Sequence, residues 1–168
     1  MLRKVISGGQ TGADQAALRA AQTCGLPCGG WRPPDRLCEA GEHAFPLEET
    51  PADRSPHAPD VPRSLRTEWN VRDSDGTLIL RPAHGLPPGP GTAWTEQCAA
   101  QLGKPLLICE PTDPQAGEHV RRWLSDHRIE TLNVAGPSEE TAPGISDLAC
   151  EFLVEVFRAC RAPGSPRE

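Results

Sequence analysis

Residues Lys4–Leu18 read KVISGGQTGADQAAL: a short β-branched segment, a turn with three glycines, and an alanine-rich segment of helical periodicity. This order predicts a strand that leads through the turn into a helix beginning near Ala13. Glycine permits positive φ angles and a close approach of an anion to the backbone. A turn of this kind directs N–H groups and the positive end of the helix dipole toward that anion. We therefore predict that the turn binds one phosphate group of a small ligand.

The predicted phosphate-binding turn consists of five residues: Gly8, Gly9, Gln10, Thr11 and Gly12. Its backbone amides would bind the phosphate, and the side chains of Gln10 and Thr11 would add donors. Its spacing is not the G-x-G-x-x-G of dinucleotide-binding proteins, and no Lys-Ser/Thr pair follows as in a P-loop. Asp14 in the first helical turn would favour the helix dipole. The alternative is a tight strand–helix turn in which Asp14 is a structural cap.

Size and charge restrict the class of protein. The 168 residues suit one domain with its own core. A net charge of −6 argues against general binding of nucleic acid, which usually requires a basic surface. No apolar segment approaches the roughly 20 residues needed to cross a bilayer, and the first residues lack the layout of a signal peptide. We therefore expect a cytoplasmic protein without a membrane or nucleic-acid partner.

Cysteine and histidine residues give no sign of a metal site. The seven cysteines form no CxxC pair, and we expect them to be reduced thiols that pack as small apolar groups. The five histidines are scattered at positions where none has a cysteine or aspartate at ligand spacing. No protein-bound metal ion is predicted.

Strand and helix patterns alternate along the chain. Strands are predicted at residues 4–7, 28–31, 77–80, 105–109 and 131–134. Helices are predicted at residues 13–24, 63–72, 92–102, 116–127 and 145–161. This alternation predicts an α/β fold with a doubly wound, mostly parallel, Rossmann-like sheet. We expect a single domain over residues 1–162 and a flexible tail over residues 163–168, and we find no clear periodicity in the proline-rich residues 32–62.

Ligands of such sheets bind beyond the carboxyl ends of the strands, and we expect the candidate motifs to lie there. The segment RTEWNVRDSDGT at residues 66–77 is dense in polar groups: Arg66, Asn70, Asp73, Ser74 and Asp75. They would hydrogen-bond a polar heterocycle or a ribose-like edge, with Arg66 pairing an anionic group. The alternative is ordinary capping and turn chemistry. The segment lacks the later glutamate of a calcium loop.

Two further segments join a predicted strand to a helix. PGPGTAWT at residues 88–95 places Gly91 and Thr92 at a helix start, where they would either bind an anion or, through Thr92, cap the helix. NVAGPSEETAPGI at residues 133–145 ends a strand in a Gly-Pro-Ser turn. Its Glu139 and Glu140 would either bind amino groups of a ligand or face solvent.

Six blocks together resemble the molybdenum carrier, or molybdenum cofactor carrier, protein family. They are ISGGQTGADQAAL (6–18), GLPCGGW with Arg36 (25–36), FPLEET (45–50), RTEWNVRDSDGTLIL (66–80), GTAWT with GKP (91–105) and NVAGPSEETAPGI (133–145). They occur in the order of the family and cover nearly the whole chain. The family is similar in fold to lysine-decarboxylase-like and LOG-like proteins, which implies a Rossmann-type sheet and a homo-oligomer, either a dimer or a tetramer.

The resemblance implies a carrier or storage protein that binds the pterin phosphate of the molybdenum cofactor, or molybdate, and delivers it to molybdoenzymes. The residues implied to hold the phosphate or oxyanion are Gly8–Gly12, Thr92, Arg32, Arg36 and Arg66. Those implied to line the pterin side are Asn70, Asp73, Ser74 and Asp75. Gly136, Pro137 and Ser138 would close the pocket.

An enzyme is the main rival to the carrier. PGPGTAWTE is reminiscent of P-G-G-x-G-T-x-x-E in LOG-like nucleotide phosphoribohydrolases, where an arginine and a glutamate cleave an N-glycosidic bond. Glu96 lies one residue beyond the position of that glutamate, a rotation of about 100° around a helix, which would turn its carboxylate off the site. The sequence therefore favours a carrier without catalytic residues, and a hydrolase or a nucleotide-sensing module stays open.

Overall fold

The structure is a computed structural model that describes residues 1–34, 45–82 and 88–160. Five parallel strands form its central sheet: β1 (Lys4–Ile6), β2 (Cys28–Gly29), β5 (Gly76–Leu80), β6 (Leu106–Cys109) and β7 (Thr131–Ala135). Their order across the sheet is β2-β1-β7-β5-β6, so the last strand of the chain fills the centre. The predicted parallel α/β fold is confirmed.

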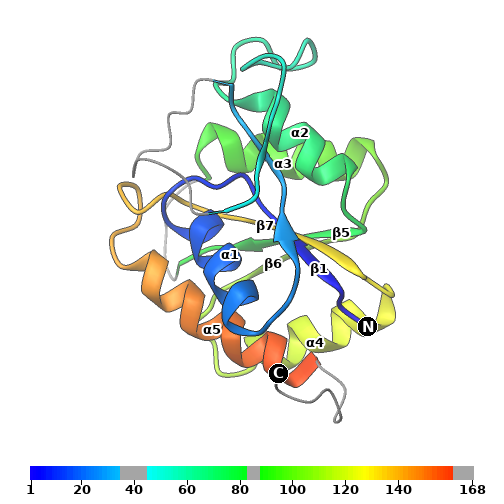
Figure 1. Ribbon diagram of the computed structural model, residues 1–168, viewed down its shortest axis with the longest axis vertical. Helices are drawn as coiled ribbons and strands as arrows, with labels where there is room; N and C mark the ends of the chain where they lie inside the picture. The colour runs from blue at the N-terminus through cyan, green and yellow to red at the C-terminus, as the bar shows by residue number, and fades with distance from the viewer. Residues whose placement is uncertain (35–44, 83–87, 161–168) are drawn as a thin grey trace.

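Helices cover both faces of the sheet (Figure 1). On one face lie α1 (Ala13–Thr23), α4 (Ala116–Asp126) and α5 (Ile145–Cys160). On the other face lie α2 (Ser64–Arg72) and α3 (Pro90–Gln101). Each helix lies within a few residues of its predicted range. Gly25 follows the end of α1 with a φ of 64°, a left-handed conformation that suits glycine at a helix C-terminus.

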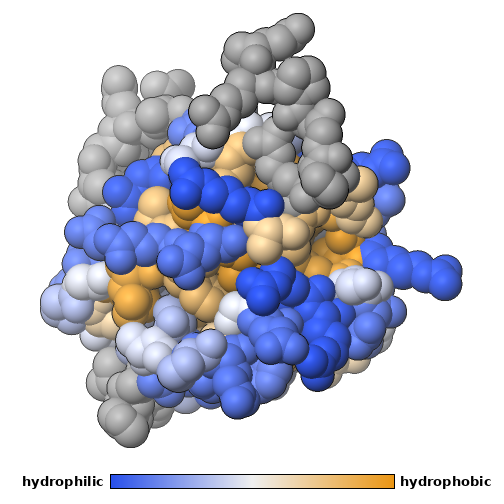
Figure 2. All heavy atoms as spheres, turned by 90° about the horizontal axis from the view of Figure 1, so that it is seen from below, coloured by the Kyte–Doolittle hydropathy of each residue, from blue (hydrophilic) through white to orange (hydrophobic). Residues whose placement is uncertain are grey.

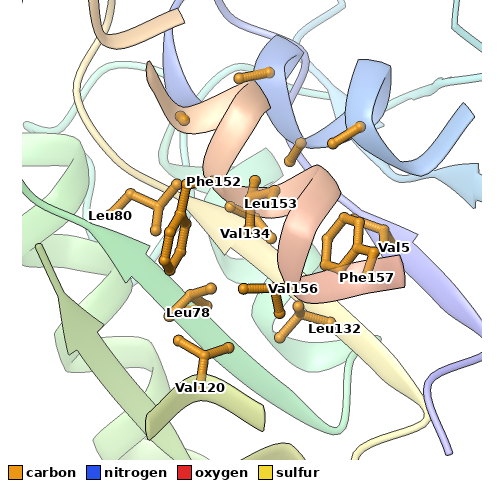
Figure 3. Packing of buried hydrophobic residues seen from close by; sticks show 14 of the residues in the cluster. Val5, Leu78, Leu80, Val120, Leu132, Val134, Phe152, Leu153, Val156 and Phe157 are labelled. Atoms are coloured by element: carbon orange, nitrogen blue, oxygen red, sulfur yellow. The ribbon is translucent and has the colours of Figure 1, made fainter. Parts of the chain in front are cut away.

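The larger core lies between the sheet and α5 (Figure 3). Alternate residues of β5 and β7, such as Leu78 and Leu132, point toward this face and meet Phe152 and Phe157 of α5. Each fully buried side chain of this size stabilises the fold by roughly 1.5–3 kcal/mol. The smaller core, on the other face, gathers around Val71 and Trp94 of α2 and α3.

The segment predicted as one strand at residues 28–31 is two strands. At Gly30 the backbone turns with a φ of 128°, and the chain leaves the central sheet. It continues as β3 (Trp31–Arg32), which pairs in parallel with β4 (Glu48–Glu49) in a second, two-stranded sheet. A Cβ atom at position 30 would lie 2.3 Å from the carbonyl oxygen of Ser7, so this crossing requires glycine.

The start of α3 differs from its predicted position. The helix expected to start at Thr92 starts at Pro90, because a proline suits the first helical position. The predicted tail at residues 163–168 lies outside the described residues. Within the described ranges, no helix has the length and apolar character needed to cross a bilayer.

The lower face of the molecule, toward α4 and α5, is mostly hydrophilic, with apolar areas showing between the polar side chains (Figure 2). Among the described residues, the large apolar side chains that are exposed are those of Met1, Leu102 and Ile108. The predicted dimer or tetramer stays a prediction.

Candidate functional site

A cavity of about 400 Å³ lies at the carboxyl ends of the neighbouring strands β5 and β7. Its walls come from the residues that follow these two strands and from the first turns of α1, α2 and α3. Of the residues predicted for the site, seven line it: Asp14, Arg66, Gly91, Thr92, Gly136, Pro137 and Ser138. The cavity therefore lies where a Rossmann-like sheet binds its ligands.

The charged groups that line the cavity are mostly cationic. Among the described residues they are the guanidinium groups of Arg63, Arg66 and Arg81 and the carboxyl group of Asp14. The first turn of α3, with Gly91 and Thr92, adds the positive end of a helix dipole. Guanidinium groups and helix N-termini are groups that bind anions in proteins.

Asp14 and Arg66 form a buried ion pair at the cavity wall. Nη1 of Arg66 lies 2.9 Å from Oδ2 of Asp14, and their side chains are only 16% and 5% exposed. Burial raises the pKa of the Asp14 carboxyl above its usual range, and the charge of Arg66 opposes this change. The pair fixes the guanidinium group of Arg66 beside the cavity.

The glycine-rich turn lies behind the cavity wall. None of residues 8–12 lines the cavity, and the N–H of Gln10 donates to the carboxylate of Asp14 at 3.3 Å. Directly after Gly12 in the sequence, the N–H of Ala13 donates to the carbonyl oxygen of Pro137 at 3.1 Å. A Cβ atom at Gly12 would lie 2.4 Å from that same oxygen. The amide of Gln10, which was predicted to bind phosphate, therefore binds the protein's own carboxylate in this structure.

Asn70 and Asp73 hold the start of β3. The side-chain oxygen of Asn70 accepts the N–H of Trp31 at 2.9 Å, and its amide nitrogen donates to the carbonyl oxygen of Trp31 at 3.0 Å. Asp73 accepts the indole N–H of Trp31 at 2.7 Å and pairs with Arg72. The hydrogen bond from Arg72 is the main reason that the pKa of Asp73 is lowered. Neither residue lines the cavity.

Ser74 and Asp75 lie at the opposite edge of the sheet from the cavity. They precede β5, whereas the cavity lies beyond the carboxyl ends of β5 and β7. Ser74 donates its hydroxyl to the carbonyl oxygen of Val71, and Asp75 accepts the N–H groups of Glu130 and Thr131. The expectation that every candidate motif lies beyond the carboxyl end of a strand is therefore wrong for residues 73–75.

Of the two arginines predicted from the segment after GGW, the structure describes Arg32, which lies away from the cavity. Nη2 of Arg32 pairs with Oε1 of Glu49 at 2.7 Å in the small sheet, and Arg32 does not line the cavity. Arg36 lies outside the described residues.

Sequence reasoning missed two cavity arginines. Arg81 directly follows β5, so the rule that selects residues after a strand would have found it. Nη2 of Arg81 pairs with Oε1 of Glu96 at 2.6 Å, and Glu96 itself does not line the cavity. Arg63 precedes α2 with a φ of 58°, a conformation that is unusual for a residue with a side chain. The sequence carries no signal for that backbone angle.

Within the described part of the chain, no three His, Cys, Asp or Glu side chains come together as a metal site. Of the two glutamates after β7, Glu139 binds backbone: it accepts the N–H groups of Gly144 and Ser146 at the start of α5. The chemistry of the cavity is therefore that of guanidinium groups, hydroxyls, helix ends and proline-rich apolar walls.

A parallel sheet between two helix layers, with a cavity at its carboxyl edge, defines a single-domain Rossmann-like α/β protein. The chain belongs to the circularly permuted YpsA family of SLOG proteins, whose family model matches residues 5–157.

A solved structure supports the same assignment. The crystal structure of a protein named putative molybdenum carrier protein, from Syntrophus aciditrophicus SB, is 41% identical in sequence and has a TM-score of 0.80. The match covers 93% of this chain and 94% of that chain. No curated protein matches the chain. The family resemblance found in the sequence is thus confirmed.

Proposed function

We propose that the protein is a carrier that binds the molybdenum cofactor, through its pterin phosphate, in the cavity at the carboxyl edge of the sheet. The observation that carries this proposal is the set of three arginines, Arg63, Arg66 and Arg81, around one cavity. Guanidinium groups bind phosphate with two parallel hydrogen bonds, which gives affinity and orientation. The name of the 41% identical protein supports molybdenum as the cargo.

The size and walls of the cavity favour the whole cofactor over free molybdate. A volume of about 400 Å³ lies in the range of sites for organic ligands. Much of the wall is apolar, because it includes Leu80, Pro82, Pro88 and Pro90. A bare oxyanion gains nothing from these surfaces, whereas a ring system can pack against them.

The proposed roles follow from the positions of the residues. The arginines and the first turn of α3, with Gly91 and Thr92, bind the phosphate. The loop after β7, with Gly136, Pro137 and Ser138, closes the other side. Asp14 acts through Arg66, which it holds at 2.9 Å.

Native mass spectrometry of the protein purified from its own host tests the proposal. We expect a bound mass that includes molybdenum and a pterin, and the same spectrum reports the number of subunits. Arg81→Met should lose the bound mass, because it removes one cavity cation. Arg122→Met is the matched control, since Arg122 is exposed on α4 and pairs with Glu118. A wild-type protein without bound molybdenum, or equal retention by the Arg81 variant, would contradict the proposal.

A LOG-like phosphoribohydrolase is the second candidate, because an arginine and a glutamate, Arg81 and Glu96, form a pair at the edge of the cavity. Incubation with AMP separates the two functions. Release of free adenine supports the hydrolase, and AMP that stays intact supports a binding protein. Retention of molybdenum through gel filtration then supports the carrier over a nucleotide-sensing module.

A further inference from the structure

We infer that the glycine-rich turn and the start of α1 position two arginines of the anion site: Gln10, in the turn, holds Arg63, and Asp14, in the first turn of α1, holds Arg66. The inference deepens the proposed function and rests on its anion-binding cavity. It assigns Gln10 and Asp14 as positioning residues that act through the arginines, in place of a turn that contacts the ligand with its own amides.

The first contact joins the turn to the N-terminus of α2. Nη1 of Arg63 donates to Oε1 of Gln10 at 2.9 Å. Gln10 is 6% exposed and does not line the cavity, whereas Arg63 does. Among the described residues, Nε2 of Gln10 has no hydrogen-bond partner. Burial of an amide group with an unpaired N–H donor costs free energy. The hydrogen bond between the amide oxygen of Gln10 and Arg63 therefore explains why this side chain is buried here.

The backbone of Arg63 supports a dedicated position for this residue. Its φ of 58° and ψ of 24° lie in the left-handed region, which a residue with a side chain occupies only when its surroundings fix it. Its N–H donates to Oδ2 of Asp53 at 3.3 Å, and its guanidinium group donates to Gln10. The two contacts hold both ends of the residue.

The second contact explains the absence of a side chain at position 8. A Cβ atom on Gly8 would lie 1.7 Å from Nη1 of Arg66 and 2.8 Å from Oδ2 of Asp14. Glycine therefore leaves the space through which Arg66 reaches Asp14, at 2.9 Å. The same carboxylate accepts the N–H of Gln10 at 3.3 Å. The backbone of Gln10 therefore fixes Asp14, which holds Arg66, and the side chain of Gln10 holds Arg63.

Both arginines belong to the start of α2, and both line the cavity. The two guanidinium groups donate hydrogen bonds to Gln10 of the turn and to Asp14 of α1, and these bonds fix their position before a ligand arrives. Such preorganisation strengthens binding, because less side-chain freedom is lost when the anion binds. The turn thus supports the anion site from behind.

Arginine reactivity tests the positioning without any ligand. Phenylglyoxal modifies accessible guanidinium groups, and mass spectrometry gives the rate for each arginine. We expect Gln10→Leu to raise the rate at Arg63 about fivefold, the factor that corresponds to one hydrogen bond, with little change at Arg66. Asp14→Asn should raise the rate at Arg66 instead. Gln22→Leu, the same change at an exposed position of α1, is the control.

The pattern of rates decides the inference. Unchanged rates at both arginines, or a uniform rise that includes Arg81 in a variant that is still folded, would overturn it. If Asp14→Asn does not fold, the Gln10 variant alone decides, because its change is neutral in charge and close in volume.

A double-mutant cycle with inorganic pyrophosphate, measured by calorimetry, tests the consequence for binding. Gln10→Leu should weaken pyrophosphate binding about fivefold in the wild-type background and not at all in an Arg63→Met background. An equal loss in both backgrounds would show that Gln10 contacts the anion itself, which overturns the inference. If the wild-type protein does not bind pyrophosphate, the proposed phosphate site fails, and the arginine reactivity still decides the positioning role.

Discussion

At the carboxyl edge of the central sheet, arginines surround a cavity, whereas at the amino edge Asp75 and Lys104 bind the backbone of neighbouring elements. Both edges are rich in polar residues, and the segment at residues 66–77 reaches from one edge to the other along α2. Its first part, with Arg66, lines the cavity, and its last part, with Asp75, lies before β5. The direction of the following strand therefore separates cavity residues from residues that bind the backbone within one continuous motif.

The groups at the amino edge satisfy specific backbone atoms. Oδ2 of Asp75 accepts the N–H groups of Glu130 and Thr131 at 3.0 and 2.7 Å, at the start of β7. The ammonium group of Lys104 donates to the carbonyl oxygens of Arg72 and Ser74, at the end of α2. These interactions connect α2 to the strands that follow it, so the lysine of the GKP motif has a structural role.

The largest effect is expected at the carboxyl edge, from Gly8→Ala. The new Cβ atom would lie 1.7 Å from Nη1 of Arg66, so the ion pair with Asp14 must break or the turn must move. We expect the affinity for pyrophosphate, measured by calorimetry, to fall more than about tenfold. The free energy of unfolding should fall by about 1–3 kcal/mol, as in other overpacked sites.

Gly117→Ala is the control for this prediction. It lies in α4, and its new Cβ atom would meet its nearest neighbour at an ordinary 3.7 Å. Alanine is the better helix former, so this variant should be as stable as the wild type or slightly more stable. Equal pyrophosphate affinity in the Gly8 variant and the control would show that the position of Arg66 does not matter for binding.

Asp75→Ala tests the amino edge. It removes the acceptor of two backbone N–H groups, each bonded to a charged oxygen. Both bonds lie in exposed surroundings, so we expect the free energy of unfolding in urea to fall by about 1–2 kcal/mol. The affinity for pyrophosphate should not change. The exposed Asp60, changed to alanine, is the control and should be nearly neutral. A loss of anion affinity in the Asp75 variant would show that Asp75 contributes to the anion site, and it would contradict the difference between the two edges.

The sequence predicts the elements of the fold better than their arrangement. Periodicity and glycine positions locate all five helices and the five strands of the central sheet to within a few residues, because they are local signals. The order of the strands is not local: β7 inserts between β1 and β5 through contacts that only the folded chain makes. The small sheet was missed for a different reason: β4 consists of two charged residues without strand character.

Residues of the cavity are predictable where they follow a strand or start a helix, as Thr92 and Gly136 do. Asp73, Ser74 and Asp75 were selected because polar residues next to a buried strand look the same at either end. Arg63 could not be found, because its place at the cavity depends on a left-handed backbone angle. The partner of Asp14 was also out of reach, because Arg66 is distant in sequence and approaches through the space that Gly8 leaves.

Glu96→Gln is expected to strengthen pyrophosphate binding moderately, whereas Gly8→Ala is expected to weaken it. Arg81 and Glu96 pair at 2.6 Å and are both about one third exposed, so the pair is partly screened by solvent. Removal of the carboxylate charge leaves Arg81 more available to an anion, and the affinity for pyrophosphate should rise about threefold. Weaker binding would instead make Glu96 a residue that holds Arg81 in its binding position. If AMP is hydrolysed, the same variant should stop that reaction.

The smallest effect is expected from Glu139→Gln, because Glu139 lies on the surface beside Ser138. Its carboxylate accepts the N–H groups of Gly144 and Ser146, and these bonds hold the pKa of Glu139 below its usual 4.5. A lowered pKa in the folded state means that the carboxylate stabilises the fold above pH 4.5, and that this contribution is lost as the pH falls through the folded-state pKa. The glutamine variant should therefore unfold at a lower urea concentration than the wild type at pH 7, and the gap should narrow as the pH is lowered below 4.5. A gap that keeps its size as the pH is lowered would assign the difference to shape and not to charge. Glu139 lies at the carboxyl edge but binds backbone, as Asp75 does at the amino edge. Its variant therefore also tests whether a place at the carboxyl edge is enough for a residue to affect anion binding. Unchanged pyrophosphate affinity would show that a residue contributes to the anion site only when it also borders the cavity.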